Sequence, residues 1–310
     1  MADRIGPYDV GERAGIREIV ALDTGKPLRA PEGDPLETGL MLLDHAIGGG
    51  LRPKRLVTIG ARSGYGKSAL AEQIALQVSK RARTMYLGLE LGRERTIDRM
   101  FAKVIGTDVQ SARRAMQHPS PGMREQFERL TYDRNLVVEE RKIGERFTLD
   151  TALLLMNVNH PKVVIIDHMR HLDDWLAPAS AGQRGDVPAA LVARRLAEIA
   201  YETNITIIAV HQAKNALQGS RPTQHDLADT AALAQHSDHV WMIHRPFRSQ
   251  GLRDTIAEVV VDKNREGPEC LLHFEWTGRL MRYRDMMPGD EESLTCCKAK
   301  RTQTPRYDQT

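Results

Sequence analysis

The chain has 310 residues and a formal net charge of +3, a small surplus among many charges of both signs. This balance neither requires nor excludes a nucleic-acid partner, because binding depends on where basic residues gather and not on their total. The three cysteines, Cys270, Cys296 and Cys297, lack the spacing of a disulfide framework or a metal site. No apolar run approaches the ~20 residues of a membrane span, and no signal peptide is visible. We therefore expect a cytoplasmic protein with no membrane partner.

The first part of the chain predicts an arm followed by alternating strands and helices. Residues 1–35 are polar and interrupted by proline and glycine, which predicts an N-terminal arm or linker. After them, short apolar segments alternate with segments whose apolar residues recur at helical spacing. The expected strands are 55–60, 84–90, 135–140, 162–167 and 205–210. The expected helices are 67–80, 93–105, 107–131 with an interruption at 118–122, 148–159 and 189–203.

The last third of the chain changes character. Residues 239–245, 255–265, 269–276 and 279–284 look like successive strands without helices between them. Alternating strand–helix units predict an α/β fold with a mainly parallel twisted sheet and helices on both faces. The late strands would extend that sheet as added antiparallel strands. We expect one domain over 36–284 and a disordered tail over 285–310, which shows no periodicity.

A P-loop follows the first expected strand. The pattern is Ala61-x-x-x-x-Gly66-Lys67-Ser68, with alanine where glycine is usual. The backbone N–H groups of such a loop surround phosphates, and the N-terminus of the following helix adds its dipole. Lys67 would reach the β- and γ-phosphate oxygens, and Ser68 would bind Mg²⁺. We therefore predict a site for ATP and Mg²⁺ formed by Gly60, Ala61, Arg62, Ser63, Gly64, Tyr65, Gly66, Lys67, Ser68 and Ala69.

Two acidic residues at strand ends complete the expected chemistry. Asp167 ends the apolar segment "VVIID", where the metal-binding aspartate of a P-loop NTPase belongs. Glu90 ends "YLGLE", the expected strand directly after the P-loop helix. The carboxyl ends of parallel strands share one edge of a sheet, which is where ligands bind. We therefore predict that Asp167 helps to hold Mg²⁺ and that Glu90 polarises the attacking water.

Five segments in order give the chain a specific resemblance. Residues 37–71 contain the P-loop, 85–100 contain Glu90, 163–172 contain Asp167, 207–245 contain "VHQ" and "RPTQHDL", and 256–268 contain "DKNREGP". Together they resemble the RecA-like ATPase domain of DnaB-family replicative helicases. The resemblance covers about residues 36–284, and it implies a RecA-like P-loop NTPase fold and ATP-dependent DNA unwinding.

The resemblance also implies roles for four further residues. Gln212 would hydrogen-bond the γ-phosphate and sense its presence. Lys263 and Arg265 would reach the γ-phosphate of a neighbouring subunit, where an arginine finger stabilises the charge that develops during phosphoryl transfer. Arg99 would stack on the nucleotide base, although an exposed helix arginine is an equally simple interpretation.

The family closes hexameric rings around single-stranded DNA, so the resemblance implies both a homo-oligomer and a single-stranded DNA partner. A helicase loader or a primase is a further possible partner. We expect no counterpart of the family's N-terminal primase-interacting domain, because only about 35 residues precede the ATPase segments, and such a stand-alone form is typical of phage or plasmid replication proteins. The segment expected to face DNA departs from the family, since Ala228 replaces a basic residue and 229–232 read "DTAA". Asp229 and Thr230 remain candidate phosphate contacts, with Lys214, Arg221, Arg248 and Arg253 as compensating charges.

Two other functions stay open at this point. A RecA- or RadA-like recombination ATPase would form a filament on DNA, and a KaiC-like regulatory ATPase would form a ring without unwinding anything. The order of the "HQ", "RP", "DL" and "KNREGP" segments favours the helicase. His168 and His171 have a spacing that suits a metal site, but we interpret them as solvated or nucleotide-edge residues because they follow the Asp167 strand.

Overall fold

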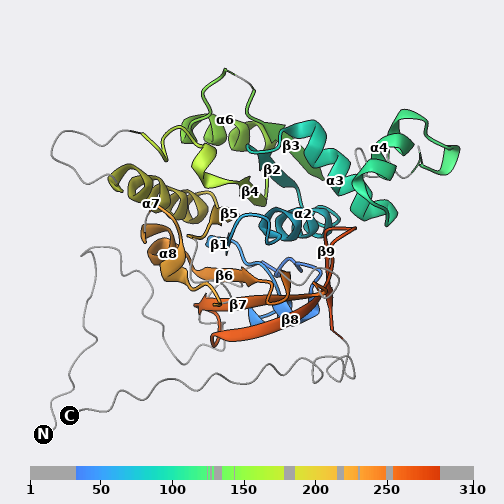
Figure 1. Ribbon diagram of the computed structural model, residues 1–310. Helices are drawn as coiled ribbons and strands as arrows, with labels where there is room; N and C mark the ends of the chain where they lie inside the picture. Colours follow the sequence, from blue (N-terminus) through green and yellow to red (C-terminus); the bar gives the residue numbers. More distant parts are fainter. Residues whose placement is uncertain are drawn as a thin grey trace, which may run out of the picture. The chain divides into compact units, whose positions relative to one another are not determined.

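The computed structural model describes residues 33–286 apart from short gaps (Figure 1). The gaps are 124, 126–127, 129–134, 143, 178–185, 215–219, 230 and 249–253. The predicted arm (1–35) and tail (285–310) lie almost entirely outside the described residues, so both stay predictions.

A nine-stranded sheet, in the order β3-β2-β4-β5-β1-β6-β7-β8-β9, forms the centre of the described chain. From β3 to β6 every neighbouring pair is parallel, and β7, β8 and β9 continue the sheet as antiparallel neighbours. The predicted RecA-like α/β architecture is therefore confirmed. The strands are β1 (Arg55–Ala61), β2 (Thr84–Gly88), β3 (Leu136–Glu140), β4 (Val163–Asp167), β5 (Thr206–Gln212), β6 (His239–His244), β7 (Ile256–Asn264), β8 (Cys270–Thr277) and β9 (Arg282–Asp285).

Helices cover both faces of this sheet. Successive side chains of a strand point to opposite faces, and in β4 the residues Val163 and Ile165 pack with α1 to α4, whereas Val164 and Ile166 pack with α6 to α8. All residues of β4 are buried, as expected for a central parallel strand. The helices are α1 (Met41–Ala46), α2 (Lys67–Val78), α3 (Arg93–Ile105), α4 (Val109–Gln117), α6 (Leu149–Asn159), α7 (Val187–Glu202) and α8 (Ala232–His236), with short 3₁₀ turns η1 (Met169–His171) and η2 (Gln224–Asp226).

Three details differ from the sequence-based expectation. β2 ends at Gly88, so Glu90 lies in the turn after the strand and not in the strand itself. The short helices α1 and α8 were not predicted, because six and five residues are too few to show a helical period. β9 includes Asp285, whose carboxylate accepts hydrogen bonds from the N–H groups of Met41 (2.8 Å) and Leu42 (3.0 Å) at the start of α1.

Among the described residues, no helix combines the length and the apolar character that crossing a bilayer requires.

Candidate nucleotide-binding site

The P-loop connects β1 directly to α2, as the sequence predicts. Gly66 precedes α2 with φ +103°, a conformation that L side chains rarely adopt. A Cβ atom at this position would also lie 2.3 Å from the hydroxyl of Tyr283 on β9. That hydroxyl donates to the carbonyl oxygens of Gly66 (3.2 Å) and Tyr65 (3.4 Å). The glycine therefore permits both the turn and its support by the last strand.

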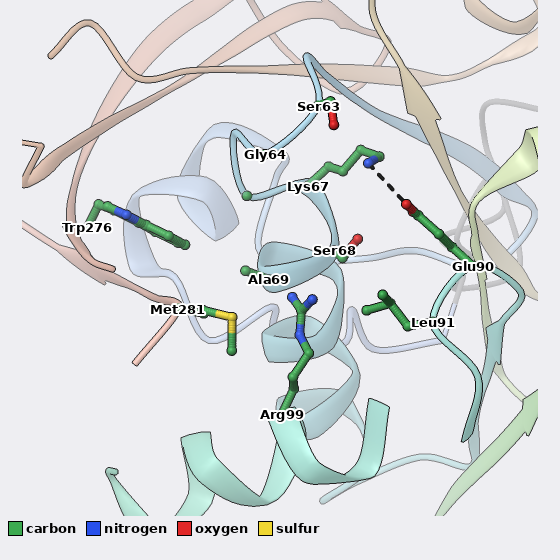
Figure 2. A pocket seen from close by; sticks show the side chains of 11 residues that line it. Ser63, Gly64, Lys67, Ser68, Ala69, Glu90, Leu91, Arg99, Trp276 and Met281 are labelled. Carbon is green, nitrogen blue, oxygen red and sulfur yellow. Dashed lines mark ion pairs between the residues drawn. The ribbon is translucent and has the colours of Figure 1, made fainter. Parts of the chain in front are cut away.

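Lys67 and Glu90 face each other across the opening of this loop (Figure 2). Their Nζ and Oε2 atoms are 3.9 Å apart. The strand register explains the position of Glu90, since Gly88 pairs with Asp167 and the N–H of Leu89 donates to the Asp167 carbonyl at 2.7 Å. Lys67 is 7% exposed, whereas the Glu90 side chain is 39% exposed. A buried lysine at the loop is suited to bind a phosphate, and a carboxylate open to solvent is suited to bind a water molecule.

Asp167 lies at the end of β4 and is almost fully buried. Its Oδ2 accepts a hydrogen bond from the hydroxyl of Tyr86 at 2.6 Å, whereas Oδ1 has no hydrogen-bond partner among the described residues. Burial raises the pKa of Asp167, and the hydroxyls of Tyr86 and Ser68 and the charge of Lys67 act in the opposite direction. A buried carboxylate oxygen without a partner, close to a serine hydroxyl, is an oxygen donor set that suits Mg²⁺.

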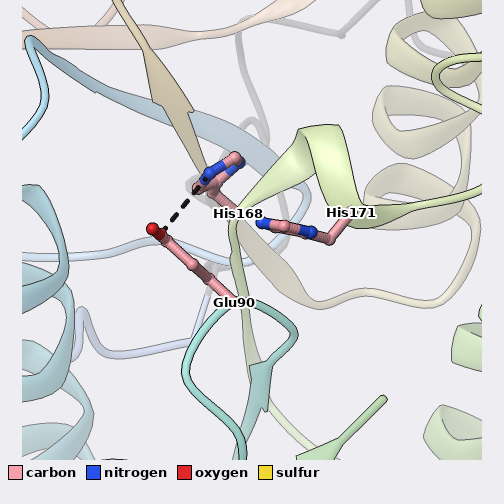
Figure 3. Close-up of side chains that lie close together, drawn as sticks. All are labelled: Glu90, His168 and His171. Carbon is pink, nitrogen blue, oxygen red and sulfur yellow. Dashed lines mark ion pairs between the residues drawn. The ribbon is translucent and has the colours of Figure 1, made fainter. Parts of the chain in front are cut away.

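His168 lies beside Glu90, which lines the pocket (Figure 3). Its Nε2 atom is 3.4 Å from Oε2 of Glu90, and its Nδ1 atom accepts the N–H of Arg170 at 3.3 Å. Burial, chiefly, lowers the pKa of His168 to about 3, so the ring is neutral near pH 7 and carries its proton on Nε2.

The ring of His171 is tilted by 48° against that of His168, with the centroids 4.5 Å apart. One possible ligand atom from each ring and one from Glu90 lie within 4.8 Å of one another. The interpretation of the two histidines as nucleotide-edge residues, and not as a metal site, stays a prediction.

A buried ionic group holds Arg99 at the pocket. Glu72 on α2 is fully buried, and its Oε1 atom lies 2.8 Å from Nε of Arg99. Its other oxygen pairs with Lys103, and burial lowers the pKa of that lysine despite the pairing. Two cations on α3 therefore share one carboxylate on α2. The sequence did not reveal Glu72, because a single acid in an otherwise apolar helix gives no indication of what it contacts.

One pocket collects most of the predicted nucleotide-binding residues (Figure 2). Trp276 of β8 and Met281 also line it, because the last strands fold back beside α2; Leu91 is a further addition. Trp276 is 5% exposed and belongs to the core, yet it also lines the pocket. In the sequence, Trp276 is an aromatic residue next to a turn, and this pattern is too common to identify a ligand-binding residue. The predicted residues in the lining are Ser63, Gly64, Gly66, Lys67, Ser68, Ala69, Glu90 and Arg99.

The other predicted residues of the site lie next to this lining. Gly60 and Ala61 end β1, and Arg62 extends its guanidinium to the Ser220 carbonyl at 3.3 Å. Tyr65 packs near Arg62 and Arg248. Gln212 ends β5, where it pairs with Ala61. The predicted phosphate sensor is therefore next to the P-loop, on the adjacent strand.

Lys263 and Arg265 lie at the opposite end of β1 from the P-loop. Asn264, between them, pairs with His239, which pairs with Val57 near the start of β1. The run from Val57 to Ala61 spans roughly 13 Å at about 3.3 Å per residue. Lys263 donates to the carbonyls of Ala234 (2.8 Å) and Gln235 (2.9 Å) in α8, while Arg265, 57% exposed, pairs with Asp238 at 2.9 Å. Neither side chain reaches the nucleotide pocket of its own chain.

The basic residues that are candidates for DNA contact differ in their exposure and in their pairing with acidic residues. Arg221 forms a two-pronged pair with the buried Glu258 at 2.7 and 2.8 Å, so its charge is compensated inside the chain. Arg248 is exposed, with its guanidinium 5.2 Å from the Tyr65 ring beside the P-loop. Lys214 is exposed. Thr230 and Arg253 lie outside the described residues.

A family model, described as "DnaB-like helicase C terminal domain", matches residues 35–285. Among curated proteins, a "Replicative DNA helicase DnaB" of Treponema pallidum (strain Nichols) is 24% identical over 80% of this chain and 55% of its own length. A "Probable plasmid replicative DNA helicase" of Chlamydia trachomatis serovar L2 is 26% identical over 71% of this chain and 48% of its own length. The chain thus spans about half the length of these relatives.

Two solved structures share the fold. One, titled as an ATPase domain, superimposes with a TM-score of 0.70 at 19% identity, covering 82% of this chain and 92% of that one. A structure titled "The Structure Of A DnaB-Like Replicative Helicase And Its Interactions With Primase" gives a TM-score of 0.70 at 20% identity, covering 82% of this chain and 62% of that one.

Proposed function

We propose that this chain, which belongs to the DnaB-like helicase C-terminal domain family, is an ATP-hydrolysing motor that moves along single-stranded DNA during replication. The observation that carries this proposal is the division of the predicted catalytic residues between the two ends of β1. Lys67, Glu90 and Asp167 gather at the P-loop end, whereas Arg265 is exposed at the other end.

At the P-loop end, each side chain has a distinct task. Lys67 and the N–H groups of the loop would hold the phosphates. Mg²⁺, held by Ser68 and Asp167, would neutralise charge on the β- and γ-phosphates. Glu90 would orient a water molecule and accept its proton, and neutral His168 would keep the carboxylate in place through its Nε2 proton. Gln212, next to Ala61 at the end of β5, is placed to contact the γ-phosphate.

The base of the nucleotide would lie between Arg99 and the side chains of Trp276 and Met281, which line the same pocket. Glu72 fixes the guanidinium of Arg99 by their ion pair of 2.8 Å. A planar cation held on one side and an aromatic ring on the other suit a flat aromatic base.

Arg265 would complete the P-loop site of an adjacent subunit. Repeating such a contact head to tail forms a closed ring when the rotation between subunits closes. We propose a hexameric ring around single-stranded DNA, as the family resemblance implies. Arg265 suits the finger role better than Lys263, because Lys263 is already engaged by two carbonyl groups of its own chain.

We further propose that the protein acts in the cytoplasm of its host, with a helicase loader or a primase as a possible partner. A related structure is titled for its interactions with primase, but that chain is longer than the part matched here. A phage- or plasmid-type replication protein would fit the likeness to the plasmid replicative helicase.

The first test is ATP hydrolysis with and without single-stranded DNA, at low and moderate salt, for the wild type and Arg265→Ala. The matched control is Arg194→Ala, which removes an exposed arginine on α7 that pairs with Glu198 at 2.8 Å. DNA should stimulate the wild type, and Arg265→Ala should lose roughly 10³-fold or more in rate while still binding nucleotide. Arg194→Ala should behave like the wild type.

The salt series separates the outcomes. Phosphate contacts weaken steeply with salt, so stimulation should be greatest at low salt. If DNA changes neither the rate nor the affinity for nucleotide at low salt, the helicase proposal is wrong and a regulatory ring ATPase is the better description. If the protein instead assembles on DNA as an open filament, a recombination ATPase is favoured.

A further inference from the structure

Asp229 lies in the segment between η2 and α8, which the family resemblance leads us to expect near DNA, yet its side chain is directed into the protein. Its backbone has φ +66°, in the left-handed region. Its Oδ2 atom accepts the indole N–H of Trp175 at 3.0 Å and lies 3.1 Å from Nε of Arg170. The same oxygen is 3.6 Å from Nε2 of His211. Three side chains therefore converge on one carboxylate oxygen.

These partners come from the ends of two different central strands. Arg170 belongs to η1, directly after β4 and Asp167, and Trp175 follows the same turn. His211 is the last but one residue of β5 and is fully buried. Asp229 thus joins the strand end that carries the predicted metal ligand to the strand end that carries the predicted phosphate sensor.

Main-chain hydrogen bonds connect the same segment to the P-loop. The N–H of Ala228 donates to the carbonyl of Gln212 at 3.0 Å, and the N–H of Ala213 donates to the carbonyl of Ala61 at 2.8 Å. The Nε2 atom of His211 lies 2.9 Å from the carbonyl oxygen of Ala228. Burial lowers the pKa of His211 to about 4, so this ring is neutral and donates its Nε2 proton. Residues 228 and 229 are therefore bonded directly to the end of β5 and, through it, to the end of β1.

The charge of Asp229 also argues against a direct phosphate contact. A carboxylate repels DNA phosphates, and Arg170 compensates this one from within the chain. The side chain is 23% exposed, which leaves little of it to meet a strand of DNA.

We propose that Asp229 is a positioning residue that ties the DNA-facing segment to the ends of β4 and β5, so that the state of the nucleotide site sets the position of that segment. This inference rests on the proposed function, because it assumes that residues near 224–229 face DNA. The alternative is a carboxylate that only stabilises the fold.

The test uses Asp229→Asn in the full chain, with Asp226→Asn as matched control. Asp226 is the last residue of η2, and its carboxylate accepts the N–H of Thr223 at 2.7 Å. Within the described part of the chain, no hydrogen bond or ion pair joins that side chain to η1 or β5. Asp229→Asn should keep basal ATP hydrolysis and single-stranded DNA affinity near wild type. It should lose about tenfold or more of the stimulation by DNA, within the range of coupling between sites. Asp226→Asn should keep full stimulation.

Two further variants separate coupling from simple stabilisation. Arg170→Gln should reproduce the loss of stimulation, and the double variant should be no worse than either single one, because residues in one interaction are not additive. A loss of DNA affinity that matches the loss of stimulation would identify Asp229 as a direct contact and overturn the proposal. Unchanged stimulation in Asp229→Asn would overturn it as well.

The fluorescence of Trp175 gives a readout that does not need DNA. Trp175→Phe provides the blank, since it keeps an aromatic ring beside His211 but removes the N–H donated to Asp229. A non-hydrolysable ATP analogue and ADP should give different Trp175 signals in the wild type and the same signal in Asp229→Asn. If DNA fails to stimulate the wild type, the proposed function fails while this measurement still decides the inference. Identical signals with both nucleotides in the wild type would overturn it.

Discussion

The two ends of β1 differ in how many of the predicted catalytic residues lie beside them. At the P-loop end, Lys67, Glu90 and Asp167 come together through parallel register and are supported by Tyr86, His168 and Tyr283. At the other end, Arg265 is exposed and paired only with Asp238 among the described residues. The P-loop end of β1 therefore has most of the predicted catalytic residues, and the other end has the exposed Arg265 beside Lys263, which donates to two carbonyls of α8. This separation is what the proposed completion of the site by a second copy of the chain requires.

The largest expected effect tests whether Glu90, at the P-loop end of β1, is the base for ATP hydrolysis. Glu90→Gln should lower the rate of ATP hydrolysis by about 10²–10⁴-fold, because the amide cannot accept the proton of water. Nucleotide binding should persist, since Lys67 and the loop are unchanged. Steady-state hydrolysis and binding of a fluorescent ATP analogue measure the two properties. Glu94→Gln, on α3 next to the site, is the control and should leave both unchanged.

Mixing two inactive variants sharpens the comparison between the ends. Subunits with Glu90→Gln keep Arg265, and subunits with Arg265→Ala keep Glu90, so a mixed assembly contains some complete sites. Hydrolysis should therefore rise when the two variants are mixed, to a fraction of the wild-type rate set by the mixing ratio. A mixture no more active than its components, in a demonstrated mixed oligomer, would place Arg265 outside catalysis.

Replacing Glu72 should lower the stability of the protein, because Glu72 joins α2 to α3 through its ion pairs with Arg99 and Lys103. Glu72→Gln leaves the buried Lys103 and the partly buried Arg99 beside each other without an acid. Removing one partner of a buried ion pair costs about 3–5 kcal/mol. Thermal unfolding should shift to lower temperature, and ATP should protect the variant less because Arg99 is no longer fixed. Glu198→Gln, in an exposed helix pair, should change the unfolding free energy by less than about 1 kcal/mol. Equal decreases in the unfolding temperature of the two variants would mean that the ion pairs of Glu72 do not stabilise the fold.

The smallest expected effect is a decrease in the free energy of unfolding at acidic pH. The pKa of His211 is lowered to about 4 in the folded protein, and its ordinary value is 6.5. Between these values the unfolded chain binds a proton that the folded chain does not, so the free energy of unfolding should fall as pH falls from 6.5 towards 4. One such group contributes up to about 1.4 kcal/mol per pH unit. Urea unfolding at several pH values measures the slope, and His211→Gln should make it shallower than in the wild type.

The sequence predicted the strands well because each central strand is a short apolar segment with a helix before or after it. Val163 to Ile166 are apolar on both faces, as burial beneath two helix layers requires. The antiparallel end was predicted from the absence of helices between the late segments. Helix α8 was missed because its five residues are held by tertiary contacts, among them the bonds from Lys263 to two of its carbonyls.

The site was predictable where chain order determines position. A P-loop fixes Lys67 and Ser68, and parallel strand ends place Glu90 beside Asp167. Contacts between distant segments were not predictable in this way. Trp276 and Met281 reach the pocket only because the last strands fold back beside α2, and Glu72 meets Arg99 only through the packing of α2 on α3. The inward direction of Asp229 depends on its left-handed backbone and on three partners from other segments.

The bonds from Asp285 to the N–H groups of Met41 and Leu42 bring the first helix and the last strand of the described chain side by side. Segments that lie this close can be joined by a short linker, which is the condition for circular permutation. A circularly permuted protein, with residue 286 joined to residue 36 by a short glycine–serine linker and new ends placed between Trp175 and α7, should fold into the same sheet. Such a protein would offer attachment points for probes next to η1, far along the chain from residues 36 and 286.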